Sequence, residues 1–185
     1  MNEEFSPIRH GARRGLPLGL FIGAVMLMLL ASAHAPLLGL IGLIGACGVP
    51  VLAFMAQRES LTATSGGTPV SGVWLSGTMA FVCAALVCGV LVLAYLRWID
   101  PTYLIDRLNE ASVLLADNPD PAWQKLAADA RAMVDNHTVP SGTDLTISLI
   151  WLIIFSGLLY SGLCAIVLKA SGTGKPRKMT RNTTK

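Results

Sequence analysis

The sequence predicts an all-α membrane protein with four transmembrane helices and an extracytoplasmic amphipathic helical hairpin between the third and the fourth. Hydrophobic residues make up 53% of the 185 residues and charged residues only 14%, whereas charged residues make up about a quarter of a soluble domain. The charged residues are also absent from four long windows. This distribution of charged residues argues against a large soluble core.

The first two predicted spans form a tight helical hairpin. Residues 16–33 carry no charge, and at 1.5 Å per residue they are just long enough to cross a hydrocarbon core of about 30 Å. The second span covers 37–56, so the chain is expected to turn at His34 to Pro36. Pro50 predicts a kink in the second span.

A removable signal peptide is the alternative for the first span. Ala31, Ala33 and Ala35 have the A-x-A spacing of a cleavage site, and basic residues precede the apolar run. The run is longer than the usual apolar region of about 7–15 residues, and another apolar run follows at once. These features favour retention of the first span, while cleavage after Ala33 stays open.

The third and fourth spans are predicted over 73–96 and 145–168. None of the four spans contains Asp, Glu, Lys, Arg or His, which disfavours a proton- or ion-coupled transporter. The four cysteines lie within the apolar windows and are interpreted as packing residues. The strongest polar groups suit interhelical hydrogen bonds, and they are Ser76, Thr78, Ser148, Ser156, Tyr160 and Ser161.

Small residues recur at every fourth position and predict close helix packing. They lie on the first span (Gly19, Gly23), the third span (Ser76, Ala80, Ala84) and the fourth span (Gly157, Ser161). Packing within one chain is favoured, and packing between chains stays open.

Lys and Arg residues predict the orientation. Ten of the 14 lie in the two tails and in the connection between the second and third spans, and four lie between Arg97 and Arg131. The positive-inside rule therefore places both termini in the cytoplasm. The resulting organisation is a basic cytoplasmic tail over 1–14, a membrane domain over 15–169 and a second basic cytoplasmic tail over 170–185, with both tails expected to be disordered.

The external segment 99–144 holds most of the acidic residues. Asp100-Pro101 and Asp120-Pro121 resemble an N-cap followed by a proline in the first turn, so each predicts a helix start. Apolar stripes follow at helical spacing. The stripes could pack on each other, lie on the outer leaflet, cap the bundle or meet another membrane or periplasmic protein through the 101–136 hairpin. The possible partner contacts are Tyr103, Leu108, Trp123, Leu126 and Met133.

No pattern in the sequence points to chemistry. His137 near Asp135 has no metal-ligand spacing and no nucleophile or base to complete a catalytic set. We therefore expect no catalytic residue, cofactor or metal. The charge distribution indicates that the lipid bilayer is a partner and that a nucleic acid is not.

The order of parts resembles an uncharacterised bacterial membrane family, the domain of unknown function 4199. The resemblance covers about 16–170 and includes the tight first hairpin and the segment YLRWIDPTYLIDRL, with the IDP-x-Y junction at Ile99 to Tyr103. It implies a four-helix bacterial inner-membrane protein and attaches no activity to any residue. The leading hypothesis is a non-enzymatic accessory or interaction protein. The alternative is a small transport or channel component that acts as an oligomer.

Overall fold

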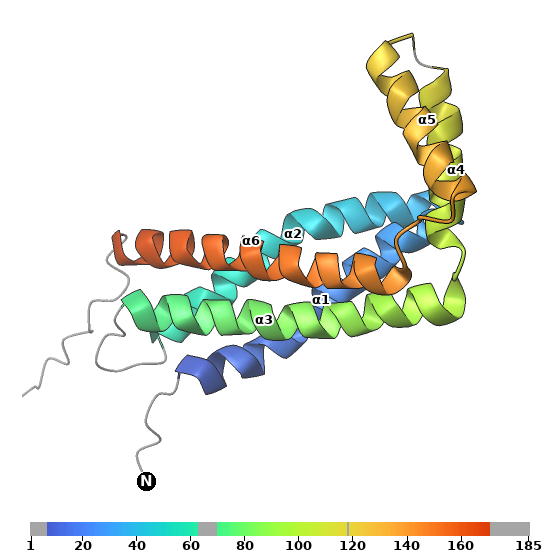
Figure 1. Ribbon diagram of the computed structural model, residues 1–185. Helices are drawn as coiled ribbons and strands as arrows, with labels where there is room; N and C mark the ends of the chain where they lie inside the picture. Colours follow the sequence, from blue (N-terminus) through green and yellow to red (C-terminus); the bar gives the residue numbers. More distant parts are fainter. Residues whose placement is uncertain (1–6, 63–69, 118, 171–185) are drawn as a thin grey trace, which may run out of the picture. The chain divides into compact units, whose positions relative to one another are not determined.

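The computed structural model describes residues 7–62, 70–117 and 119–170, and every element in these ranges is helical. Four helices are long and apolar enough to cross a membrane, which confirms the four predicted spans: Gly11–Ala31, Pro36–Glu59, Ser71–Ile99 and Gly142–Ala170. The elements in Figure 1 are α1 (Pro7–Ala31), α2 (Pro36–Thr62), α3 (Val70–Ala94), the π-helical turn η1 (Tyr95–Ile99), α4 (Tyr103–Ala116), α5 (Pro121–Asp135) and α6 (Gly142–Ala170).

Both helices of the first hairpin extend beyond the apolar windows. The prediction of a disordered tail over 1–14 is wrong for its described part, because α1 begins at Pro7 and includes Arg13 and Arg14. The connection expected after Ala56 is also shorter than predicted, since α2 continues to Thr62. Arg, Gln and Glu are good helix formers, so a helix does not end where its apolar window ends. Apart from Ala170, the predicted tail over 170–185 lies outside the described residues.

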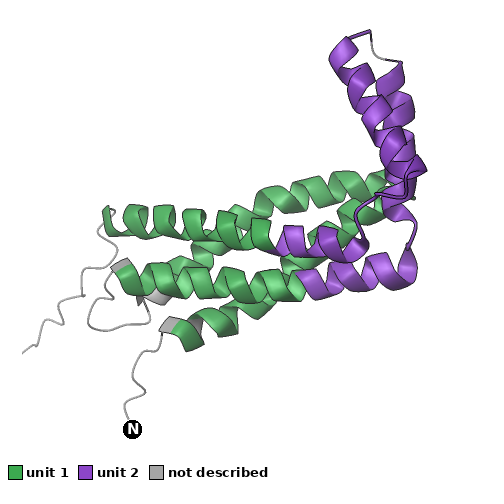
Figure 2. Cartoon of the chain, viewed as in Figure 1, with its two compact units in different colours: residues 1–88, 151–185 green, residues 89–150 purple. Residues whose placement is uncertain are grey.

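The chain divides into two compact units, and the division passes through α3 and α6 (Figure 2). Unit 1 contains residues 1–88 and 151–185, and unit 2 contains residues 89–150.

A short turn joins α1 and α2 in unit 1. The Ser32 hydroxyl donates to the carbonyl of Leu29 (2.6 Å), and the amide of His34 donates to the carbonyl of Ala31 (3.0 Å). These bonds satisfy carbonyl groups that have no partner within the helix at its C-terminal end. The predicted turn before Pro36 is therefore confirmed.

Helices α1 and α3 approach each other through small residues. A Cβ atom added to Gly15 would lie 2.6 Å from the carbonyl oxygen of Ala80, and one added to Gly19 would lie 2.8 Å from the Cα of Ala84. Gly11 faces the Ser76 carbonyl in the same way. The glycine side of α1 thus contacts the backbone of α3 directly, which is how small residues allow membrane helices to pack.

In unit 2, the C-terminal part of α3 runs into η1. The amide of Asp100 donates to the carbonyl of Tyr95 (3.0 Å), five residues earlier, which is the bond of a π-turn. Tyr95 and Leu96 are buried in this turn. The prediction that Asp100 caps the following helix is wrong: α4 begins later and has Thr102 at its N-cap position, while the Asp100 amide closes the π-turn.

Helices α4 and α5 lie side by side (Figures 1 and 2). Asp120 caps α5 as predicted, because its carboxylate accepts from the Ala122 amide (2.9 Å) and Pro121 occupies the first turn. The buried contact is made of small side chains, namely Ser112, Ala127 and Ala130. After α5 the chain reverses at His137, whose φ of 52° is left-handed, as is common at helix C-termini.

Candidate functional site

A buried glutamine lies in the helix bundle of unit 1. Gln57 belongs to α2, and only 4% of its surface is exposed. Neither its amide nitrogen nor its amide oxygen has a hydrogen-bond partner among the residues that the structure describes. An unpaired buried amide costs roughly 1–3 kcal/mol, so Gln57 is an unusual residue at this position.

Gly77 of α3 provides the space for this glutamine. A Cβ atom at Gly77 would lie 2.6 Å from Nε2 of Gln57 and would overlap the hydroxyl of Ser161. Ser161 is fully buried on α6 and donates to the carbonyl of Trp74 (3.1 Å). Side chains from α2 and α6 therefore meet at one glycine of α3. We call Gln57, Gly77 and Ser161 the polar cluster.

Further hydrogen bonds join the helices around the polar cluster. The Tyr160 hydroxyl donates to the carbonyl of Pro50 (2.6 Å), and the Trp74 indole donates to the carbonyl of Leu158 (3.2 Å). The predicted interhelical bonds are confirmed for Tyr160 and Ser161. Thr78 and Ser156 instead donate to carbonyl groups of their own helices.

The space beside the polar cluster is small. A cavity of about 10 Å³ lies among residues of α1, α2 and α3, and Gln57, Ser76 and Gly77 are part of its lining. This volume has room for about one water molecule. The space can therefore hold a water or a single polar group, and none of the three residues of the polar cluster is a base that could activate the Ser161 hydroxyl.

The sequence analysis missed Gln57 because the predicted second span ended at Ala56. The signal that could have found it is periodicity. Gln57 follows buried Ala53 by four residues, so it continues the same face of a helix. The same reasoning applies to Gly11 and Gly15, which share the fourfold spacing of Gly19 but precede the predicted window.

The residues expected to pack helices lie as follows. Gly19, Ser76, Ala80 and Ala84 lie at the contact between α1 and α3, and Gly157 lies against the ring of Phe81. Ser161 belongs to the polar cluster, and Gly23 is buried in α1.

The five possible partner contacts fall into two groups. Tyr103 and Leu108 are half-buried on α4, and the guanidinium of Arg107 lies over the Tyr103 ring, 5.6 Å from its centroid. Three residues of α5 are exposed: Trp123 (46%), Leu126 (50%) and Met133 (46%). We call these three residues the apolar edge of α5.

The apolar edge exists because the predicted apolar stripe of α5 is wider than the contact of α5 with α4; the stripe consists of Trp123, Leu126, Ala127, Ala130, Met133 and Val134. Ala127 and Ala130 fill that contact, and the larger residues of the stripe lie beside it. Val113 and Leu114 of α4 are also exposed, and sequence reasoning did not single them out. They lie outside the apolar stripe of α4, so the helical spacing of apolar residues does not point to them. That stripe consists of Leu104, Leu108, Ala111 and Leu115.

No group of three or more His, Cys, Asp or Glu side chains is placed to hold a metal ion within the described ranges. Cys47, Cys83, Cys88 and Cys164 are free thiols.

A family model described as "Protein of unknown function (DUF4199)" matches residues 13–170. This match confirms the resemblance inferred from the sequence. Searches of curated proteins and of solved structures found no match.

Proposed function

We propose that this chain, which belongs to the DUF4199 family of proteins of unknown function, is a non-enzymatic accessory or interaction protein of the bacterial inner membrane. It docks another membrane or periplasmic protein through the 101–136 hairpin. The observation that carries this proposal is the apolar edge of α5, which leaves a Trp, a Leu and a Met exposed on one helix.

The composition of the apolar edge suits protein recognition. Trp is the residue most typical of binding hot spots, and Met adapts its shape to a partner surface. Lys125, Asp129 and Arg131 are exposed on the same helix and would form a polar rim. An anionic lipid surface is a poorer partner, because segment 99–144 carries more acidic than basic residues.

A docking test uses a photo-crosslinking amino acid at Leu126 in the full chain, in intact membranes. We expect a discrete crosslinked protein, because Leu126 is the middle residue of the apolar edge. Trp123→Asp should lower the crosslinked fraction by about tenfold, since it places a charge in a desolvated contact.

The matched control is Gln124→Asp, which adds the same charge at the neighbouring exposed position of α5. It should leave the crosslink almost unchanged. The absence of any discrete adduct, or an equal loss with both variants, would count against docking through the apolar edge.

The proposed orientation has the hairpin outside and both termini in the cytoplasm, and it follows from the ten Lys and Arg residues that are expected on one side. A cysteine-free variant with Asp129→Cys should react with an impermeant maleimide in intact spheroplasts. The same background with Thr183→Cys should react only after lysis. The reverse pattern of labelling would invert the proposed topology.

The alternative is a transport or channel component that acts as an oligomer. It is less well supported, because the cavity beside the polar cluster has room for about one water molecule, and the ionisable residue in its lining, Arg14, is paired with Glu59. A solute flux in proteoliposomes that depends on Ser76 and Thr78 would favour this alternative over docking.

A further inference from the structure

A second, larger cavity lies between α1 and α2 of unit 1. Its volume is about 540 Å³. The residues that line it form an apolar part and a charged part. The apolar part consists of Pro17, Leu18, Phe21, Leu52, Met55 and Ala56, and the charged part consists of Arg13, Arg14 and Glu59.

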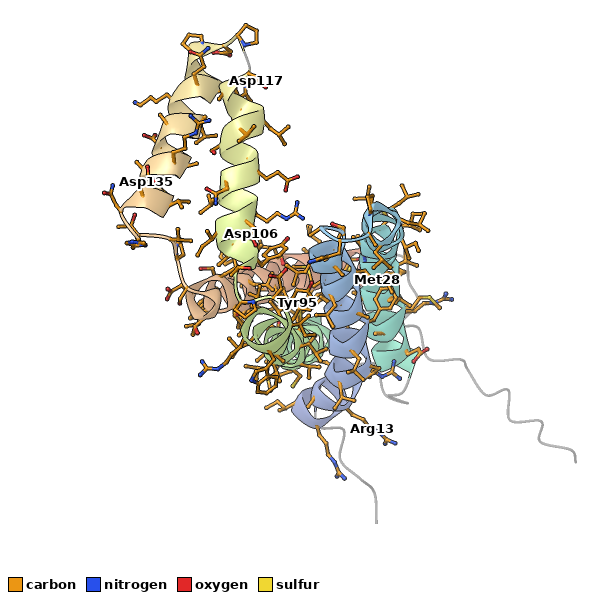
Figure 3. All side chains as sticks on the ribbon, turned by 90° about the vertical axis from the view of Figure 1, so that its right-hand side faces the viewer. Arg13, Met28, Tyr95, Asp106, Asp117 and Asp135 are labelled. Atoms are coloured by element: carbon orange, nitrogen blue, oxygen red, sulfur yellow. The ribbon has the colours of Figure 1, made fainter. Side chains whose placement is uncertain are left out.

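The charged residues lie together at one end of the cavity, because Arg13 and Arg14 are near the start of α1 and Glu59 is near the end of α2. Arg14 is held in place: its guanidinium pairs with Glu59 and donates to the carbonyl of Ala56 (3.1 Å). Arg13 is exposed near the start of α1 (Figure 3) and has no carboxylate partner among the described residues. Among the described residues, the charge of Arg13 is therefore not balanced by a carboxylate at this end.

The apolar part extends from this charged end along both helices. Phe21 follows Arg13 by eight residues, which is about 12 Å along a helix, and Leu52 precedes Glu59 by seven, about 10 Å. Pro17 lines the cavity and lies inside α1. It cannot donate a hydrogen bond to the Arg13 carbonyl, which favours a bend at this level.

A cation at one end and two helical turns of apolar surface beyond it match an amphiphile with an anionic head. We propose that the cavity between α1 and α2 binds one anionic phospholipid, with its phosphate at Arg13 and an acyl chain along Phe21 and Leu52. The site is independent of the hairpin and of the proposed docking function.

The net charge of the cavity lining determines which class of phospholipid fits best. The cavity carries two arginines and one glutamate, hence a formal charge of +1. Phosphatidylglycerol carries one negative charge and complements this value. Phosphatidylcholine adds an ammonium group that Arg13 does not favour, and Glu59 is already paired with Arg14.

The test is native mass spectrometry of the full-length protein, purified in detergent, stripped of lipid and titrated with either phospholipid carrying identical chains. We expect a single phosphatidylglycerol to bind about tenfold more tightly than phosphatidylcholine, in line with the strength of a charge-assisted hydrogen bond. Arg13→Gln should abolish this preference.

The control is Arg58→Gln, which makes the same charge change on α2 outside the cavity lining. It should keep the preference. Arg13 and Arg58 are both exposed, and unchanged helical circular dichroism and gel-filtration profiles would exclude unfolding as the cause.

Three results would overturn the proposal. The first is equal affinity of the wild-type protein for the two lipids. The second is an equal loss with Arg13→Gln and Arg58→Gln, which would indicate diffuse attraction by basic residues. The third is displacement of the lipid by glycerol phosphate at the same concentration, which would make the cavity a phosphate site without an acyl-chain site.

Discussion

Gly15→Ala is expected to lower the free energy of unfolding by about 2–3 kcal/mol, although alanine is the better helix former. The added Cβ would lie 2.6 Å from the Ala80 carbonyl oxygen and 2.6 Å from the Cβ of Cys83. A backbone carbonyl inside a helix cannot move aside as the end of a flexible side chain can. The two helices must therefore separate, and they lose contacts along their whole shared surface.

The measurement is unfolding of the detergent-solubilised protein in dodecyl sulfate, followed by helical circular dichroism. Gly48→Ala is the matched control, because a Cβ at Gly48 would meet only the ring of Phe21, at 3.7 Å. This variant should raise the free energy of unfolding by roughly 0.5–1 kcal/mol. A rise in the free energy of unfolding with Gly15→Ala as well as with Gly48→Ala would mean that the contact between α1 and α3 is looser than the structure shows.

Gln57→Met is expected to raise the free energy of unfolding by about 1–3 kcal/mol. Methionine keeps the length of the side chain and removes an amide whose two polar atoms have no partner in the described residues. The same dodecyl sulfate unfolding experiment measures the change.

Gln57→Glu is the comparison variant, for which we expect the free energy of unfolding to change in the opposite direction. It has the same shape and would bring an acidic group into a buried position, so we expect a loss of about 2 kcal/mol or more. A loss of stability in Gln57→Met would refute the prediction, because it would mean that the amide forms a hydrogen bond with a water in the adjacent cavity or with another molecule.

Much of the fold could be predicted from local patterns. An uncharged window of about 20 residues has few alternatives to a membrane helix. The cap at Asp120 is signalled by the adjacent Asp and Pro, and the turn before Pro36 by a proline between two apolar runs. These features need no knowledge of distant residues.

The remaining features depend on neighbours that the sequence does not identify. Asp100-Pro101 and Asp120-Pro121 have the same two residues, yet Asp120 caps α5 while Asp100 lies at the end of the π-turn η1, before the N-cap position of α4. The burial of Gln57 likewise depends on Gly77, which lies on another helix. The wide stripe of α5 predicted an apolar surface, but only the packing of Ala127 and Ala130 decides which part of it stays exposed.

The glycine contact between α1 and α3 also limits how the two helices can move. At most helix contacts side chains separate the two backbones, but here the backbone of one helix rests on the backbone of the other. Within unit 1, α1 and α3 should consequently move as one stiff body. Any widening or narrowing of the cavity between α1 and α2 would then be carried by α2, which contains Pro50, a residue that favours bending of a helix.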